Sequence, residues 1–182
     1  LAAPKLFVVG NENELEAILQ KSAGTVVLLD EAYWQYLGRS SKEKIRKFPN
    51  LVILQTFSKA FGLAGLRLGC IITSRETAAT LKKAASPYSA NAIAIKAAGA
   101  AIADTEFVNQ YVKEVVRSRK FLEEGLEKLG IKTFPSEANF VLAKFGAPAG
   151  SMCKRLRAKG ILVRDIGKYP LLNGCLRITV GT

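Results

Sequence analysis

Three short apolar runs in the first half of the chain have the length of buried β-strands. They are TVVLLD at 25–30, LVILQTF at 51–57 and GLRLGCIITS at 65–74. Continuous apolar runs of this kind are typical of parallel strands that are covered on both faces. Polar segments of helical length separate them, so the pattern predicts an α/β sheet with helices on both sides.

The segments around these runs are predicted to be helices. Residues 12–21 place their leucines and isoleucine on one face, and residues 75–85 and 91–103 are rich in alanine. A longer helix is predicted to begin after Asp104, which is a good N-cap residue. It is predicted to end at Gly130, because glycine favours helix C-termini.

The pattern changes after the long helix. Short apolar segments (ANFVLAKF, ILVRDI and CLRITV) surround one basic helix near 150–159, which is an α+β arrangement. The fold class predicted is therefore α/β: part of a large domain with a mostly parallel sheet, followed by a smaller α+β C-terminal domain. The predicted domains are residues 1–104 and residues 105–182, the second including the long linking helix.

Composition narrows the class of protein. The 182 residues are 49% hydrophobic and contain no apolar run of 18, so we expect no membrane span. The start, LAAPKLFVVG, has no signal-peptide pattern. Because there is no initiating Met and the last residues, LRITVGT, stop at the end of a predicted strand, we expect a fragment.

Cysteine usage and charge argue against a zinc protein and against a protein that binds nucleic acid or a membrane. The chain has three cysteines and no histidine, so we expect no metal site of the zinc type. Without a secretion signal, the odd cysteine count favours a reducing compartment, and we expect a cytoplasmic protein. The net charge of +12 is scattered rather than clustered. A solvated basic surface explains it better than binding to nucleic acid or a membrane.

Reactive side chains follow two of the predicted strands. Asp30 and Tyr33 come at the end of the first, and Thr56, Ser58 and Lys59 at the end of the second. Ligands of open parallel sheets bind beyond the carboxyl ends of the strands. A lysine amine in an apolar setting can react with an aldehyde cofactor such as pyridoxal phosphate. That cofactor needs a carboxylate at its ring nitrogen, a donor at its phenolic oxygen, and hydroxyls and an arginine at its phosphate.

Arg67, in a glycine-spaced stretch eight residues after Lys59, completes this set of residue types. Spacing alone leaves other interpretations open. Lys59 could be an exposed lysine, Asp30 a loop carboxylate and Tyr33 a core aromatic. The VLLDE segment also resembles a magnesium-binding strand of nucleotide hydrolases, but the chain has no G-x-x-x-x-G-K-[ST] loop.

Together, VVLLDEAYWQY and NLVILQTFSKAFGLAGLRLGC resemble the cofactor-binding core of fold-type I aminotransferases, the aspartate aminotransferase-like fold. They are most similar to the histidinol-phosphate aminotransferases, whose pattern is D-E-A-Y after an apolar strand and then T-x-S-K-x-x-x-L-A-G-x-R-x-G. The resemblance continues through SPYSANAIA, PSEANFVLAKF, ILVRD and LRITVGT. It covers the chain from about Thr25 to the end.

The resemblance implies a role for each matching residue. Lys59 would be the catalytic Schiff-base lysine that moves a proton between the substrate Cα and the cofactor C4′. Asp30 would pair with the pyridinium nitrogen and Tyr33 with the phenolic oxygen. Thr56, Ser58 and Arg67 match cofactor-binding positions at or beside the phosphate. Arg177 matches the arginine that binds the substrate α-carboxylate, and Arg164 matches one that meets the substrate phosphate.

Some family segments have no counterpart before Thr25, among them the N-P-N-N-P-T-G segment and the aromatic that stacks on the cofactor. The final helix after V-G-T is also missing. Family members are dimers whose sites borrow partner residues. We therefore expect a homodimer of the full-length protein, with small amino-acid and keto-acid substrates, and little activity from the fragment alone.

The function expected is pyridoxal-phosphate-dependent transamination, with histidinol phosphate and 2-oxoglutarate as substrates in histidine biosynthesis. A threonine-phosphate decarboxylase or an aromatic aminotransferase of the same fold would keep most of these residues. A cofactor-sensing module of a transcription regulator is an alternative from another class. A basic nucleic-acid binder is a further alternative, although no aromatic–basic motif supports it.

Overall fold

The computed structural model describes residues 10–181, which form two compact units. The first unit contains the chain up to Ala32, then Arg39–Ser58 and Leu63–Ala98. The second contains Tyr33–Gly38, Lys59–Gly62 and the chain from Gly99 onward. The domain boundary predicted between residues 104 and 105 stays a prediction.

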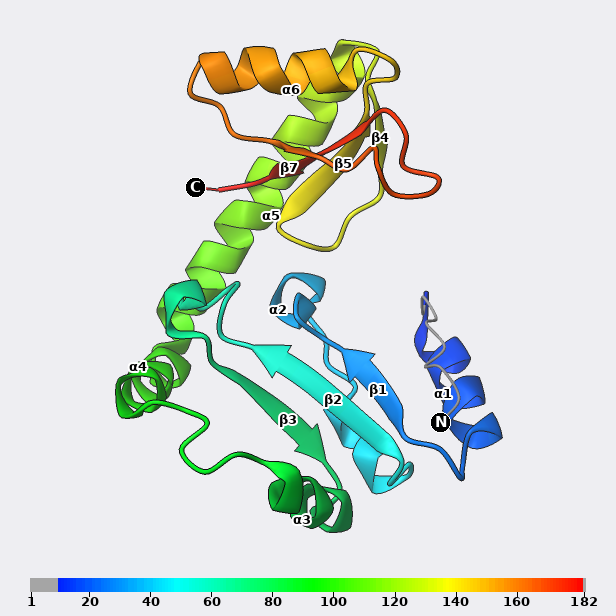
Figure 1. The fold of residues 1–182 in the computed structure, drawn as a ribbon, viewed down its shortest axis with the longest axis vertical. Coiled ribbons are helices and arrows are strands. Elements are labelled where there is room, and N and C mark those ends of the chain that lie inside the picture. Colours follow the sequence, from blue (N-terminus) through cyan, green and yellow to red (C-terminus); the bar gives the residue numbers. More distant parts are fainter. Residues whose placement is uncertain (1–9, 182) are drawn as a thin grey trace. The chain divides into compact units, whose positions relative to one another are not determined.

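The first unit is built on a three-stranded sheet (Figure 1). Its strands, in the order β1-β2-β3, are β1 (Val27–Asp30), β2 (Leu51–Thr56) and β3 (Gly69–Thr73). The parallel pairing of β1 with β2 confirms the prediction for these two strands. The prediction of a parallel third strand is wrong, because β3 runs antiparallel to β2. A parallel crossover needs a covering helix, and the residues between β2 and β3 form only a 3₁₀ turn, η2 (Ala64–Leu66).

The helices predicted for the first half of the chain are present. They are α1 (Glu12–Lys21), α3 (Arg75–Ala84) and α4 (Ala92–Ala103), and a 3₁₀ helix, η1 (Lys42–Arg46), precedes β2. The Asn11 side chain caps α1 by accepting a hydrogen bond from the backbone N–H of Glu14 at 3.0 Å. Within the described residues, no helix is both long and apolar enough to cross a membrane.

One face of the first sheet carries the core of its unit. Leu15 and Leu19 of α1 are buried against Leu51 and Ile53 of β2, together with Phe48. Leu51 and Ile53 are fully buried, and burying each side chain contributes roughly 1.5–3 kcal/mol. The expectation of two covered faces does not hold within the described residues: Leu28 is 60% and Ile71 53% exposed.

An ion-pair cluster ties α1 to η1 beside this core. The Lys44 ammonium lies 2.6 Å from one Glu16 carboxylate oxygen and 3.2 Å from Glu12. The Lys47 ammonium lies 2.9 Å from the other Glu16 oxygen. Hydrogen bonds from Lys44 and then Lys47 lower the pKa of Glu16 from 4.5 to about 2.

The second unit combines a long helix with an antiparallel sheet. The helices are α2 (Trp34–Leu37), α5 (Thr105–Lys128) and α6 (Ala149–Ala158). The sheet has the order β4-β5-β7-β6, with β4 (Lys132–Phe134), β5 (Phe140–Lys144), β6 (Arg164–Asp165) and β7 (Cys175–Thr179). All three pairings are antiparallel.

The ends of α5 agree with the sequence prediction. The Asp104 carboxylate accepts a hydrogen bond from the Phe107 N–H at 3.1 Å, and Gly130 adopts a left-handed φ of 72° just beyond the last turn. Val108 and Val115 on α5 pack in one core with Val141 of β5. Residues of β5 alternate between this core and the opposite face of the sheet, which leaves that opposite face available for a site.

Candidate functional site

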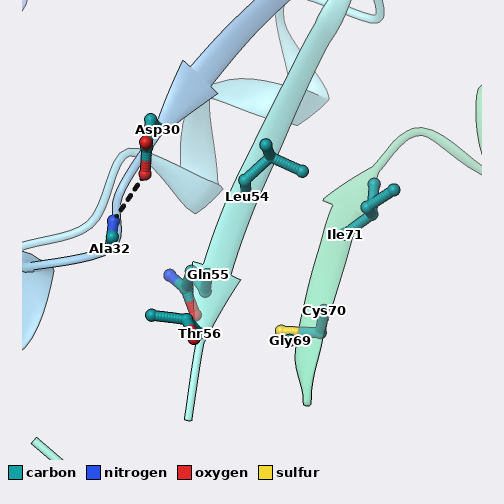
Figure 2. A pocket seen from close by; sticks show the side chains of 8 residues that line it. All are labelled: Asp30, Ala32, Leu54, Gln55, Thr56, Gly69, Cys70 and Ile71. Carbon is teal, nitrogen blue, oxygen red and sulfur yellow. Dashed lines mark hydrogen bonds between the residues drawn. The ribbon is translucent and has the colours of Figure 1, made fainter. Parts of the chain in front are cut away.

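A hollow of about 370 Å³ lies at the carboxyl ends of β1 and β2 (Figure 2). Asp30 is the last residue of β1 and Thr56 the last residue of β2, and both line this hollow. The start of β3 closes it, where Gly69 lies so near β2 that a Cβ would stand 2.8 Å from the Gln55 carbonyl oxygen. Glycine is required there because of this close backbone approach.

Asp30, at the end of β1, and Glu31, just after it, have different hydrogen-bond partners. Asp30 Oδ1 accepts a hydrogen bond from the Ala32 N–H at 2.9 Å, which holds the carboxylate at the rim of the hollow (Figure 2). Glu31 is instead occupied by three donors. Its carboxylate oxygens accept hydrogen bonds from Ser40 Oγ at 2.7 Å, from the Ser41 N–H at 2.7 Å and from Gln55 Nε2 at 2.9 Å. Glu31 therefore has a structural role, and Asp30 is the carboxylate that can meet a ligand.

The predicted phosphate-binding residues follow β2. Thr56 Oγ1 accepts a hydrogen bond from the Ser58 N–H at 3.1 Å and donates to the Leu68 carbonyl at 3.4 Å. Arg67 is exposed, adopts a left-handed φ of 53° and donates from Nη1 to the Ala64 carbonyl at 3.1 Å. Ser58 and Arg67 lie outside the lining of the hollow. Thr56 thus orders the turn that leads to Lys59.

Lys59 and Tyr33 come together in the second unit. The Lys59 ammonium lies 5.4 Å from the centroid of the Tyr33 ring, within the range of a cation–π contact. Ala60, next to Lys59, is only 1% exposed in the core of that unit. The Gly62 N–H donates to the Lys59 carbonyl at 2.9 Å and closes the turn. Burial of Ala60 therefore anchors the backbone that carries the predicted catalytic amine.

Arg164 and Arg177, which are 13 residues apart in sequence, are cross-strand partners on β6 and β7. Side chains at paired positions lie on the same face of a sheet, and like charges at such positions repel each other. Two adjacent cations make this face attractive to an anion with more than one charged oxygen.

The guanidinium of Arg177 has a donor that the described residues leave unused. Its Nε is buried and has no hydrogen-bond partner among them. A buried, unpaired donor costs about 1–3 kcal/mol, so an acceptor is expected to complete the group. Arginine binds carboxylates through two parallel N–H groups, which makes a carboxylate ligand a natural acceptor.

Comparison with known proteins identifies the family. The model of the family described as aminotransferase class I and II matches residues 8–182. The chain belongs to this family. A histidinol-phosphate aminotransferase from Caldanaerobacter subterraneus subsp. tengcongensis is 38% identical over 173 residues, which are 94% of this chain and 48% of that protein. The chain therefore spans about half the length of this curated relative.

Solved aminotransferase-like structures agree with the fold. A histidinol-phosphate aminotransferase from Sinorhizobium meliloti in complex with pyridoxal-5'-phosphate is 29% identical, with a TM-score of 0.81, and the match covers 92% of this chain and 48% of that one. An L-threonine-O-3-phosphate decarboxylase from Porphyromonas gingivalis is 25% identical, with a TM-score of 0.81, and covers 93% and 54%. The α/β fold predicted from the resemblance is confirmed.

Phe140 is a further residue of this class I and II aminotransferase chain that the sequence patterns did not single out. Its ring centroid lies 5.6 Å from that of Tyr33, at 81°, and 5.3 Å from the Arg177 guanidinium carbon. Phe140 thus touches two of the predicted site residues. The only signal available was its place in the PSEANF segment, where an apolar residue at the start of a strand reads as core.

Proposed function

We propose that the full-length protein to which this chain belongs is a pyridoxal-phosphate-dependent aminotransferase acting on histidinol phosphate. Family membership supports the reaction class. The observation that carries the proposal is a row of three side-chain contacts. The Lys59 amine lies over the Tyr33 ring, which meets the Phe140 ring. The other neighbour of Phe140 is the Arg177 guanidinium, whose buried Nε has no partner among the described residues.

The residues of the first unit supply the types of group that the ring and phosphate of such a cofactor need. Asp30 presents a carboxylate at the rim of a hollow, where it would hold the ring nitrogen in its protonated form. Thr56 and Ser58 offer hydroxyls, and Arg67 offers a cation, for the phosphate. When bound, pyridoxal phosphate supplies an electron sink that stabilises negative charge at the substrate Cα.

The residues of the second unit would handle the substrate. Lys59 would hold the cofactor covalently through its amine and, once released by an incoming amino group, accept and return the proton at Cα. Tyr33 would donate a hydrogen bond to the phenolic oxygen of the cofactor. Its ring also lies against the Lys59 ammonium and restricts where the amine can move.

The paired arginines would hold the anionic groups of the two substrates: histidinol phosphate has one such group, its phosphate, and glutamate supplies the carboxylates. Arg177 would take a carboxylate through its fork of N–H groups, as the unpaired Nε suggests. Arg164 is more exposed and would take the phosphate of histidinol phosphate. Glutamate, the amino donor, carries two carboxylates, so the same two arginines could receive both substrates in turn.

Borohydride trapping tests the role of Lys59 directly. Reduction of the full-length protein with its cofactor should fix the cofactor to one peptide, and mass spectrometry should locate it on Lys59. Lys59→Ala should abolish the adduct. Lys168→Ala is a matched control, because the Lys168 ammonium also lies over a tyrosine ring, that of Tyr169 at 5.5 Å. An adduct that persists in Lys59→Ala would refute the proposal.

Decarboxylation is a second candidate reaction, favoured by the likeness to the threonine-phosphate enzyme. The same two arginines would accept a substrate with one phosphate and one carboxylate. Incubation with O-phosphothreonine separates the two reactions: a decarboxylase releases carbon dioxide, whereas an aminotransferase converts 2-oxoglutarate to glutamate when histidinol phosphate is present.

Two expectations from the sequence are also part of the proposal. The full-length protein is expected to be a homodimer, which light scattering would test, and to be cytoplasmic. The three cysteines, all unpaired in the structure, are compatible with a reducing compartment.

A further inference from the structure

We propose that Phe140 is a positioning residue: its ring holds the Arg177 guanidinium in the orientation that receives a substrate carboxylate. This inference rests on the proposed function. In the sheet register, Phe140 pairs with Thr179 and Leu142 with Arg177. Phe140 and Arg177 are therefore diagonal neighbours on one face, within reach of each other's side chains.

The contact between the two side chains is directional. The guanidinium carbon lies 5.3 Å from the centroid of the Phe140 ring. An aromatic face attracts a cation through its quadrupole, and arginine also stacks its planar group on such a face. The arginine side chain is long and flexible. Because the contact with Phe140 already restricts its rotamers, less conformational entropy is lost when a ligand binds.

The Phe140 ring is itself held in place from the other side. Tyr33 meets it nearly at a right angle, at 81°, with the ring centroids 5.6 Å apart. This edge-to-face arrangement is the favoured one for aromatic pairs. Tyr33 also contacts the Lys59 ammonium. The ring of Phe140 thus connects the residue that would bind the carboxylate to the residue next to the catalytic amine.

The backbone before Phe140 is fixed by hydrogen bonds of the second unit. Arg119 of α5 donates to the Ala138 carbonyl at 2.6 Å, and Ser136 Oγ donates to the Phe140 carbonyl at 2.6 Å. The Val180 N–H, just after β7, donates to the Asn139 carbonyl at 2.8 Å. These bonds fix the backbone that carries the Phe140 ring, which is what preorganisation requires.

The test measures succinate binding, a dicarboxylate probe, to the full-length protein by calorimetry. Phe140→Leu keeps the apolar bulk but removes the aromatic face, and it should weaken binding roughly 2- to 30-fold. Phe140→Tyr retains the face and should bind within about twofold of wild type. Phe134→Leu is the matched control, since this aromatic residue on β4 lies over Lys132 instead, 5.3 Å away, and should leave binding unchanged.

A double-mutant cycle separates positioning from packing. In the Arg177→Ala background, Phe140→Leu should cause no further loss of succinate affinity, because the group that Phe140 positions is gone. The KM for glutamate should rise in Phe140→Leu, with a smaller change in kcat. The role of Phe140 would be overturned if Phe140→Leu lowered succinate affinity equally with and without Arg177, or if it kept wild-type affinity. Borohydride trapping at Lys59 would still support the proposed function in that case. Absence of both trapping and succinate binding in the wild type would overturn both.

Discussion

Replacing Arg177 by alanine is the perturbation with the largest expected effect on ligand binding. The residue lies on β7 between β5 and β6 and is half-buried, and its shielded Nε has no hydrogen-bond partner among the residues that the structure describes. A carboxylate bound there would form charge-assisted hydrogen bonds in a partly desolvated setting. Truncation would leave that carboxylate without its partner.

The size of the loss follows from this burial. Truncating one partner of a buried, hydrogen-bonded charge pair costs about 2–5 kcal/mol. Since 1.4 kcal/mol corresponds to a factor of ten, succinate affinity should fall roughly 30- to 4,000-fold. Arg177→Lys should fall between wild type and Arg177→Ala, because lysine keeps the charge but loses the planar fork of N–H groups.

Calorimetric titration of the full-length protein with succinate measures this effect. Arg155→Ala is the control, because Arg155 is exposed on α6. This substitution removes the same charge as Arg177→Ala, but from the surface. Far-ultraviolet circular dichroism should show the same secondary structure in all variants. If Arg177→Ala binds succinate as tightly as wild type, the unpaired Nε does not mark a carboxylate site and the reasoning fails.

Three further predictions concern other parts of the chain. Arg164→Gln should raise the KM for histidinol phosphate but not for phenylalanine, and equal increases for both would contradict its phosphate role. Glu16 has a pKa lowered to about 2 by Lys44 and Lys47, so its ion pairs stabilise the fold above pH 4.5 and lose that effect as the pH falls towards 2. Glu16→Gln should therefore lower the melting temperature at pH 7, and its difference from wild type should shrink as the pH falls from 4.5 towards 2. A difference that does not depend on pH would disprove the role of these ion pairs. Leu51→Ala, at a fully buried position, should lower the free energy of unfolding by about 2–5 kcal/mol in denaturant titrations, whereas Leu162→Ala, at a 74% exposed position, should change it by less than about 0.5.

Local signals in the sequence determined most of the elements of this protein. The apolar runs at 25–30 and 51–57 became β1 and β2, because a continuous apolar segment of this length can be buried only as part of a packed sheet or helix. Asp104 and Gly130 bounded α5, because N-capping and a left-handed C-terminal residue depend on side chains within one turn of the helix end. The motifs around Lys59 also carried the family resemblance.

Contacts between distant residues were decided only by the tertiary structure. The reversal of β3, the pairing of Arg164 with Arg177 and the row from Tyr33 through Phe140 to Arg177 depend on strand register and on packing between segments far apart in the chain. A shift of one residue in register would move Arg177 to the other face of its sheet. Residue types along the chain determined which chemistry was available, and the long-range packing decided which of those residues meet.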